Sequence, residues 1–252
     1  MELKFITDYL DAYFEIDAFQ DDSANGLQVE NSKKIEKIGL AVDACQESIC
    51  KAAKAGCDLL IVHHGLFWGR QQLIVDHHYL RIRDLIMADM ALYTVHIPLD
   101  AHPEIGHNRM IASRMDLDGI EPFALYHGRH IGVKGRLKRP CLRSEAAAEV
   151  EQAIGFCQGF LKFGAERIST VAIVAGSATD PELFKELKRE CIDLFITGEP
   201  KHGAYHLAQE FGLNIFYGGH YQTETFGIMA LGEHLHKLWA IPVVFIDAPC
   251  VF

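Results

Sequence analysis

Short apolar runs alternate along nearly the whole chain with stretches in which apolar side chains recur every three or four residues. The runs are typical of buried strands, and the three-to-four spacing is typical of amphipathic helices. The runs predict strands at 38–42, 59–63, 92–96, 171–174, 194–197, 215–217 and 243–246. The helical spacing predicts helices at 5–14, 46–55, 78–88, 107–114, 144–154, 181–189, 202–211 and 225–238. Repeated strand–helix units predict an α/β fold with mainly parallel sheets.

The stretch 128–143 interrupts this rhythm. It holds six basic side chains and no acidic one, and Gly132, Gly135 and Pro140 punctuate it. This composition predicts a strand pair or a long loop, not a helix, with the basic side chains on a solvated face. We therefore expect two lobes, one at 1–125 and one at 126–252.

The two expected lobes resemble each other. In each, a short apolar strand leads through a helix to an Asp that precedes the next apolar strand, at Asp58 and at Asp193. A later strand in each lobe ends in a His that is followed four residues on by a carboxylate. The pattern predicts two related α/β lobes with a metal cleft at their junction.

Composition and charge narrow the function classes. The 252 residues are 49% hydrophobic and carry a net charge of −10, which is typical of a globular protein and weighs against a nucleic-acid partner. The seven cysteines form no C-x-x-C pair, which favours reduced thiols. No apolar run reaches the ~18 residues that span a membrane, and the N-terminus lacks a secretory pattern. We expect a cytoplasmic protein with no membrane association.

Histidines are frequent, at 14 in 252 residues, and several fall where predicted strands end. One strand ends in His63-His64, the next leads to His96 and Asp100, and a third leads through Gly218-Gly219 to His220 and Glu224. Ligands of parallel α/β sheets collect beyond the carboxyl ends of the strands. These imidazoles and carboxylates are more ligands than one tetrahedral ion can bind. They suit two ions ~3.5–4 Å apart. The adjacent residues His77 and His78 lie outside these strand ends. We expect them to lie in an exposed loop and to have no function.

Five segments together resemble one protein family over almost the entire chain. They are Asn25-Gly26-Leu27-Gln28-Val29, Val62-His63-His64-Gly65, His96-Ile97-Pro98-Leu99-Asp100-Ala101-His102, Phe195-Ile196-Thr197-Gly198-Glu199, and Gly219-His220 with Glu224. In order and spacing they resemble the Nif-three-like family, whose members are also labelled GTP cyclohydrolase type 2 homologues, in its compact form without an insertion domain. The resemblance implies a dinuclear metal centre and a ring-shaped homohexamer.

The resemblance also assigns roles to residues. It implies that the metal ligands are His63, His64, Asp100, His220 and Glu224, with Glu224 as the bridge between the ions. His96 and His102 match further positions near the centre, as partners of ligands or as proton carriers. Glu199 follows the strand equivalent to that of His63, where it is a candidate base, a partner of a ligand histidine or an exposed acid. His96 and Glu199 are therefore the candidate catalytic residues.

Two functions remain open at this point. The first is a metal-dependent hydrolase in which metal-activated water attacks a small-molecule substrate, for which the family label suggests a nucleotide. The second is a non-enzymatic metal-binding ring that serves as a regulatory or partner-binding platform. Imidazole and carboxylate ligands suit Fe, Zn, Mn or Ni, so the sequence does not fix the metal.

Overall fold

The computed structural model describes residues 1–251, and these form two compact units. The first unit comprises Met1–Leu99 and Ile228–Ala248, and the second comprises Asp100–Gly227 with a short segment that starts at Pro249. The chain passes from one unit to the other within two helices, α4 (Ile97–Asp100) and α10 (Thr225–Trp239), and again after Ala248.

The first unit is built around a five-stranded sheet with the order β1-β4-β3-β2-β11. Neighbouring strands pair in parallel, except that β1 is antiparallel to β4. Besides most of α10, its elements are α1 (Leu3–Phe14), a short 3-10 helix (Ile16–Ala18), β1 (Gly26–Val29), β2 (Ile38–Asp43), α2 (Gln46–Lys54), β3 (Leu59–His64), α3 (Asp76–Met87), β4 (Ala91–Thr94) and β11 (Val243–Phe245).

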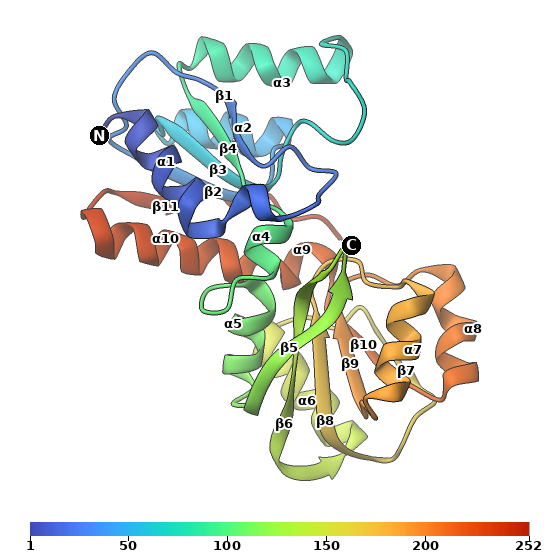
Figure 1. Cartoon of the computed structure of the whole chain (residues 1–252). Coiled ribbons are helices and arrows are strands. Elements are labelled where there is room, and N and C mark those ends of the chain that lie inside the picture. The colour runs from blue at the N-terminus through green and yellow to red at the C-terminus, as the bar shows by residue number, and fades with distance from the viewer. Residues whose placement is uncertain (252) are drawn as a thin grey trace. The chain divides into compact units, whose positions relative to one another are not determined.

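Helices cover both faces of this sheet. Ile49 of α2 and Leu85 of α3 pack against Leu60 and Val62, whose side chains share one face of β3. Helices α1 and α10 lie on the opposite face, as Figure 1 shows. Because water reaches neither face, the central strands read as continuous apolar runs, and this is why the sequence located them.

The second unit contains a six-stranded sheet with the order β5-β6-β8-β9-β10-β7. Its parallel centre is β8-β9-β10, and the strands outside it pair antiparallel. Besides the first residues of α10, its elements are α5 (His107–Arg114), β5 (Asp118–Tyr126), β6 (Arg129–Leu142), α6 (Arg143–Ile154), β7 (Gly159–Lys162), β8 (Arg167–Val174), α7 (Pro181–Arg189), β9 (Leu194–Thr197), α8 (His202–Phe211), β10 (Asn214–Tyr217) and α9 (His220–Thr223).

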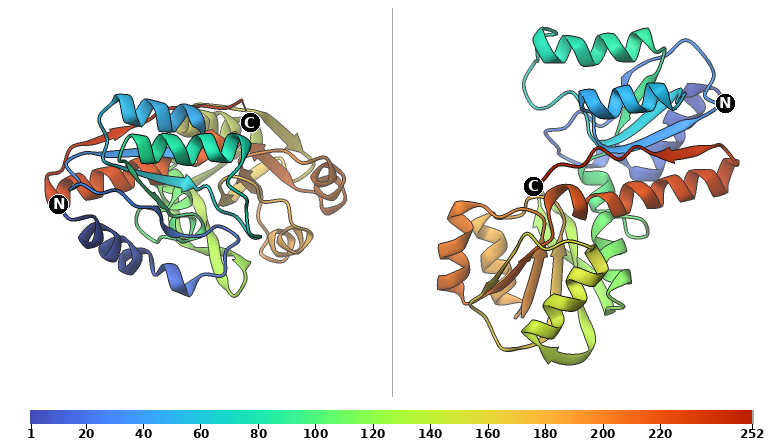
Figure 2. Two further views of the ribbon diagram at one scale, coloured as in Figure 1. Left: turned by 90° about the horizontal axis from the view of Figure 1, so that it is seen from above. Right: turned by 180° about the vertical axis from the view of Figure 1, so that it is seen from behind.

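This sheet, too, is a middle layer between helices. Phe195 of β9 faces α7 and α8, whereas its neighbours Leu194 and Ile196 face α5 and α6. Figure 2 shows α7 and α8 together on one side of the sheet and α6 on the other. The α/β fold with two sheets is therefore confirmed. The basic stretch 128–143 is one long strand, β6, whose partner β5 lies before it in the chain.

The units differ from the expected division at 1–125 and 126–252. Strand β11 pairs in parallel with β2, Val243 opposite Ile38, so the end of the chain returns to the first unit. Asp100 and α5 group with the second unit, well before residue 125. Hydrophobic periodicity identifies a strand but not the sheet that the strand joins. The predicted boundary between the lobes therefore followed the order of the elements along the chain.

The same local device occurs in both units. One carboxylate oxygen of Asp58, just before β3, accepts hydrogen bonds from the backbone N–H groups of Glu36 and Lys37. One carboxylate oxygen of Asp193, just before β9, accepts from the N–H groups of Ser169 and Thr170. In each case the acid caps backbone at or near the start of the neighbouring parallel strand. This match supports the expectation of two related lobes.

Within residues 1–251, none of the helices combines the length and the apolar character needed to cross a membrane.

Candidate metal centre

Three histidines converge at the carboxyl ends of two strands of the first unit. His63 and His64 end β3, and His96 follows β4. The ring centroid of His63 lies 4.7 Å from that of His64 and 4.9 Å from that of His96. One ring nitrogen from each lies within 4.8 Å of the other two. The structure thus brings the imidazoles of these two strand ends together within the first unit.

Hydrogen bonds fix the orientation of each ring. Nδ1 of His63 contacts the carbonyl oxygen of Val95 at 3.0 Å, and Nδ1 of His64 contacts Oδ1 of Asp43 at 2.9 Å. Nδ1 of His96 contacts both carboxylate oxygens of Asp21, at 2.9 and 3.0 Å. These oxygens only accept, so each Nδ1 carries the proton and donates. In the neutral ring, each Nε2 then holds the lone pair that a metal requires.

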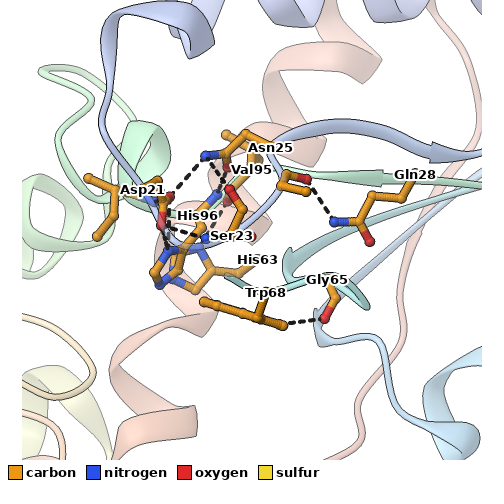
Figure 3. A network of polar contacts seen from close by, with 11 residues as sticks. Asp21, Ser23, Asn25, Gln28, His63, Gly65, Trp68, Val95 and His96 are labelled. Atoms are coloured by element: carbon orange, nitrogen blue, oxygen red, sulfur yellow. Dashed lines mark hydrogen bonds and ion pairs between the residues drawn. The ribbon is translucent and has the colours of Figure 1, made fainter. Parts of the chain in front are cut away.

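Trp68 borders this cluster. Its ring lies edge-on to His96 with a centroid distance of 4.9 Å, and its Nε1 donates to the carbonyl oxygen of Gly65 at 2.9 Å. Figure 3 shows the His63 and His96 rings beside Trp68, with dashed lines that join His96 to Asp21.

In the second unit, His220 lies between two carboxylates. It opens α9, its Nδ1 lies 3.0 Å from Oε2 of Glu199, and its Nε2 lies 3.2 Å from Oε2 of Glu224. The Glu224 side chain is only 4% exposed. Burial alone would lower the pKa of His220, but hydrogen bonds and charge from Glu224 and Glu199 raise it to about 10. The two carboxylates thus stabilise a positive charge at this ring. They would stabilise in the same way a divalent ion that replaced the proton on Nε2.

The backbone packs closely around Glu224 and His220. Gly176, which follows β8, has φ +65°, and a Cβ there would overlap Oε1 of Glu224. Gly198, which follows β9, is so close to Gly176 and α9 that a Cβ would overlap their backbone. The N–H of Gly176 also donates to Oγ1 of Thr223 at 3.0 Å. Because Gly176 and Gly198 have no side chains, the ends of β8 and β9 can approach α9 and Glu224 closely.

Asp100 closes α4, and His107 opens α5 of the same unit. The two offer ligand atoms within 4.8 Å of each other. The N–H of Gly227 donates to Nδ1 of His107 at 2.9 Å, so the neutral ring carries its proton on Nε2. In this tautomer neither ring nitrogen of His107 has a lone pair available for a metal ion. The N–H groups of Glu104 and Ile105 likewise donate to Nδ1 of His102.

The predicted site residues fall in both units. The structure brings His63, His64 and His96 together in the first unit. It separately brings His220, Glu224 and Glu199 together in the second unit, which also holds Asp100. That these two sets share one dinuclear centre stays a prediction.

Three residues of this region were not among the predicted site residues. Asp21, Asp43 and His107 are each far in the sequence from the groups that they contact. For His107 the available signal was its place at the start of a predicted helix, seven residues after Asp100. For Asp21 and Asp43 no local pattern marks the partner.

The prediction that His77 and His78 lie in an exposed loop is wrong. Both residues lie in the first turn of α3, which begins at Asp76, and not in a loop. His77 is exposed, but His78 is buried and packs edge-on against Phe67 with a centroid distance of 5.1 Å. Burial, with the nearby charges of His77 and Arg81, lowers the pKa of His78. The amphipathic spacing of α3 explains why one member of the pair faces the core.

Comparisons with known proteins identify the family of this chain. The sequence pattern of the Duf34/NIF3 family (NGG1p interacting factor 3) matches residues 1–250. The chain belongs to the Duf34/NIF3 family. Two curated relatives named "GTP cyclohydrolase 1 type 2 homolog" support this membership. The one from Archaeoglobus fulgidus is 40% identical over 249 residues, 99% of each chain, and the one from Deinococcus radiodurans is 39% identical over 241 residues, 96% of this chain and 91% of the relative.

Solved structures support the fold. The crystal structure of TTHA1606 from Thermus thermophilus matches with a TM-score of 0.90 at 40% identity and covers 100% of both chains. Reduced HcgD from Methanocaldococcus jannaschii matches with a TM-score of 0.84 at 25% identity over 98% of both chains. This Duf34/NIF3 chain therefore shares its whole architecture with these proteins.

Proposed function

We propose that this chain binds two divalent metal ions and acts as a metal-dependent hydrolase. The ligands of the proposed centre are His63, His64, Asp100, His220 and Glu224, with Glu224 bridging the ions. The proposal combines donors from both units. In the chain itself, Asp100 is joined to the first unit by one peptide bond, and Glu224 precedes Ile228 of the first unit by four residues.

The single observation that carries the proposal is the hydrogen bonding of the ligand histidines. Nδ1 of His63 faces a backbone carbonyl, and Nδ1 of both His64 and His220 faces a carboxylate, all at 2.9–3.0 Å. Metal-ligating histidines almost always donate their second ring nitrogen to such an acceptor, which fixes the tautomer and raises the basicity of the ligand nitrogen. The donor set therefore fits a divalent transition metal.

The second unit adds an electrostatic argument. Glu224 and Glu199 bring two carboxylates to one imidazole and raise the pKa of His220, which supports the proposal that this place accepts positive charge. A carboxylate that bridges two cations offsets their repulsion, and Glu224, which is buried and lies close against the backbone of Gly176, is suited to that position.

The hydrolase proposal adds a reaction to this centre. Divalent ions, when bound, supply Lewis-acid activation of water and polarise the group under attack. Glu199 holds the His220 ring through Nδ1, so it orients a ligand. The relatives' name suggests a nucleotide substrate whose base ring is opened by water, and we take a purine nucleotide as the first substrate class to test.

Metal analysis and a substrate screen test this function together. Protein purified from metal-replete medium should contain about two ions per chain. After chelation and separate reloading with Fe²⁺, Zn²⁺, Mn²⁺ and Ni²⁺, at least one form should convert a nucleotide such as GTP, and the metal-free form should not. Fewer than about one ion per chain would overturn the metal centre. Two ions without turnover of any nucleotide in the screen would overturn the hydrolase proposal and favour the non-enzymatic platform.

We also propose that the chain assembles as a ring-shaped homohexamer. An exposed apolar surface on the first unit supports self-association: Leu73, Ile74 and Val75 are 72%, 54% and 54% exposed, and Tyr79 on α3 is 49% exposed. Large exposed apolar patches on folded proteins mark interaction sites, so these side chains are candidates for a contact between copies of the chain.

A further inference from the structure

We propose that Asp21 is a positioning residue of the metal centre and that it holds His96 as a third imidazole ligand beside His63 and His64. This inference rests on the proposed metal centre, and it changes the role expected for His96 from proton carrier to ligand. Asp21 lies in the loop before β1 and comes 75 residues before His96 in the chain.

The Asp21 carboxylate is enclosed by donors, as Figure 3 shows. Its side chain is 4% exposed. Besides both contacts with Nδ1 of His96, it accepts from the N–H of Ser23 at 2.9 Å, from Nδ2 of Asn25 at 2.9 Å and from the N–H of Ile97 at 3.1 Å. So many donors fix both carboxylate oxygens, and the carboxylate in turn fixes the plane of the His96 ring.

The backbone at His96 is held separately. Its N–H donates to Oδ1 of Asn25 at 2.7 Å, and the Asp21 carboxylate accepts from the next N–H along the chain. Asn25, part of the motif that first suggested the family, thus reaches both the acid and the histidine. Side chain and backbone of His96 are therefore anchored by one short segment, 21–25.

The anchoring of Nδ1 leaves Nε2 of His96 as the ring nitrogen that can bind an ion. Because a carboxylate accepts at Nδ1, the lone pair of the neutral ring is on Nε2. Each of the three rings has a ring nitrogen within 4.8 Å of the other two, which is close enough for all three to serve as ligands of the proposed metal centre. Ligand, orienting acid and backbone anchor together form the carboxylate–histidine–metal arrangement.

Asp58 provides a matched control in the same unit. Like Asp21, it accepts from two backbone N–H groups. Its third partner is Nζ of Lys33 at 2.8 Å and not an imidazole. Asp21→Asn and Asp58→Asn each remove one buried or partly buried carboxylate charge, but only the first acts on a ring of the cluster.

The experiment measures Co²⁺ binding to the metal-free full chain, by competition with a chelator and by the visible absorption of bound Co²⁺. We expect His96→Ala and Asp21→Asn each to weaken Co²⁺ binding by at least 10-fold, within the 10–100-fold range for lost orienting partners, and to change the absorption spectrum. We expect Asp58→Asn to bind Co²⁺ with the affinity and spectrum of the unchanged protein. Thermal unfolding of each metal-free variant shows whether it folds, and His96→Ala supplies a second arm if Asp21→Asn does not.

Each other outcome overturns part of the argument. Unchanged Co²⁺ affinity in His96→Ala overturns the ligand role, and loss in His96→Ala without loss in folded Asp21→Asn overturns the positioning role. Equal loss in Asp58→Asn means that stability alone is measured, which overturns the inference. If the unchanged protein binds no Co²⁺, the metal centre itself fails. If the variants behave as expected but no substrate is turned over, only the hydrolase proposal fails.

Discussion

Replacing Gly176 by Ala tests how the fold holds Glu224. Residue 176 has φ +65°, where an L-residue costs roughly 1–2 kcal/mol, and the added Cβ overlaps Oε1 of Glu224. The carboxylate must then leave Nε2 of His220, now 3.2 Å from Oε2, and a hydrogen bond to a charged group is worth about 1.5–3 kcal/mol. We expect Gly176→Ala to lose about 3–5 kcal/mol of unfolding free energy and to bind metal at least 10-fold more weakly.

Gly212→Ala isolates the overlap from the backbone strain. Gly212 has the same φ of +65°, in the same unit, but the nearest atom to an added Cβ is the Phe163 carbonyl oxygen at 3.6 Å, an ordinary contact. It should lose only about 1–2 kcal/mol and keep its metal affinity. Urea unfolding of the metal-free chains gives the first quantity, and Co²⁺ titration against a chelator gives the second. Equal losses in the two variants, with equal metal affinity, would refute the reasoning.

Three further predictions follow from the proposals. Glu224→Gln, which keeps the size but removes the charge, should lose at least one of the two ions by elemental analysis, whereas His77→Ala should lose none; the reverse pattern would show that the ligands are wrongly assigned. Burial alone would raise the pKa of Asp58, but Lys33 and two backbone N–H groups lower it. The ionised Asp58 carboxylate therefore stabilises the fold fully above the unfolded pKa of about 3.9, and this stabilisation is lost as the pH falls through the folded pKa. Asp58→Asn should therefore be less stable than the unchanged chain at pH 7 in urea unfolding, and the difference should shrink as the pH falls below about 4; a constant difference would count against this. Light scattering at micromolar concentration should give a hexamer, and a mass near that of the 28.3 kDa chain would rule it out.

Local pattern located most of the elements. The ranges predicted at 107–114, 181–189, 194–197 and 202–211 are those of α5, α7, β9 and α8. Amphipathic spacing and flanking punctuation are properties of neighbouring residues, so a single sequence contains them. Strands β5 and β7 were not predicted: β5 is largely exposed and β7 only partly buried, so neither forms the continuous apolar run that marked the central strands.

The sequence by itself determined that His63 and His64 lie at the end of a buried strand and that His220 follows one, because continuous apolar runs mark such strands. Only the tertiary structure decided which group each ring contacts. Asp21 reaches His96 across 75 residues, Asp43 reaches His64 across 21, and Glu199 reaches His220 across 21. It also decided that β11 joins the first sheet. These contacts depend on the packing of segments that are distant in the chain, and hydrophobic periodicity contains no information about which distant segments meet.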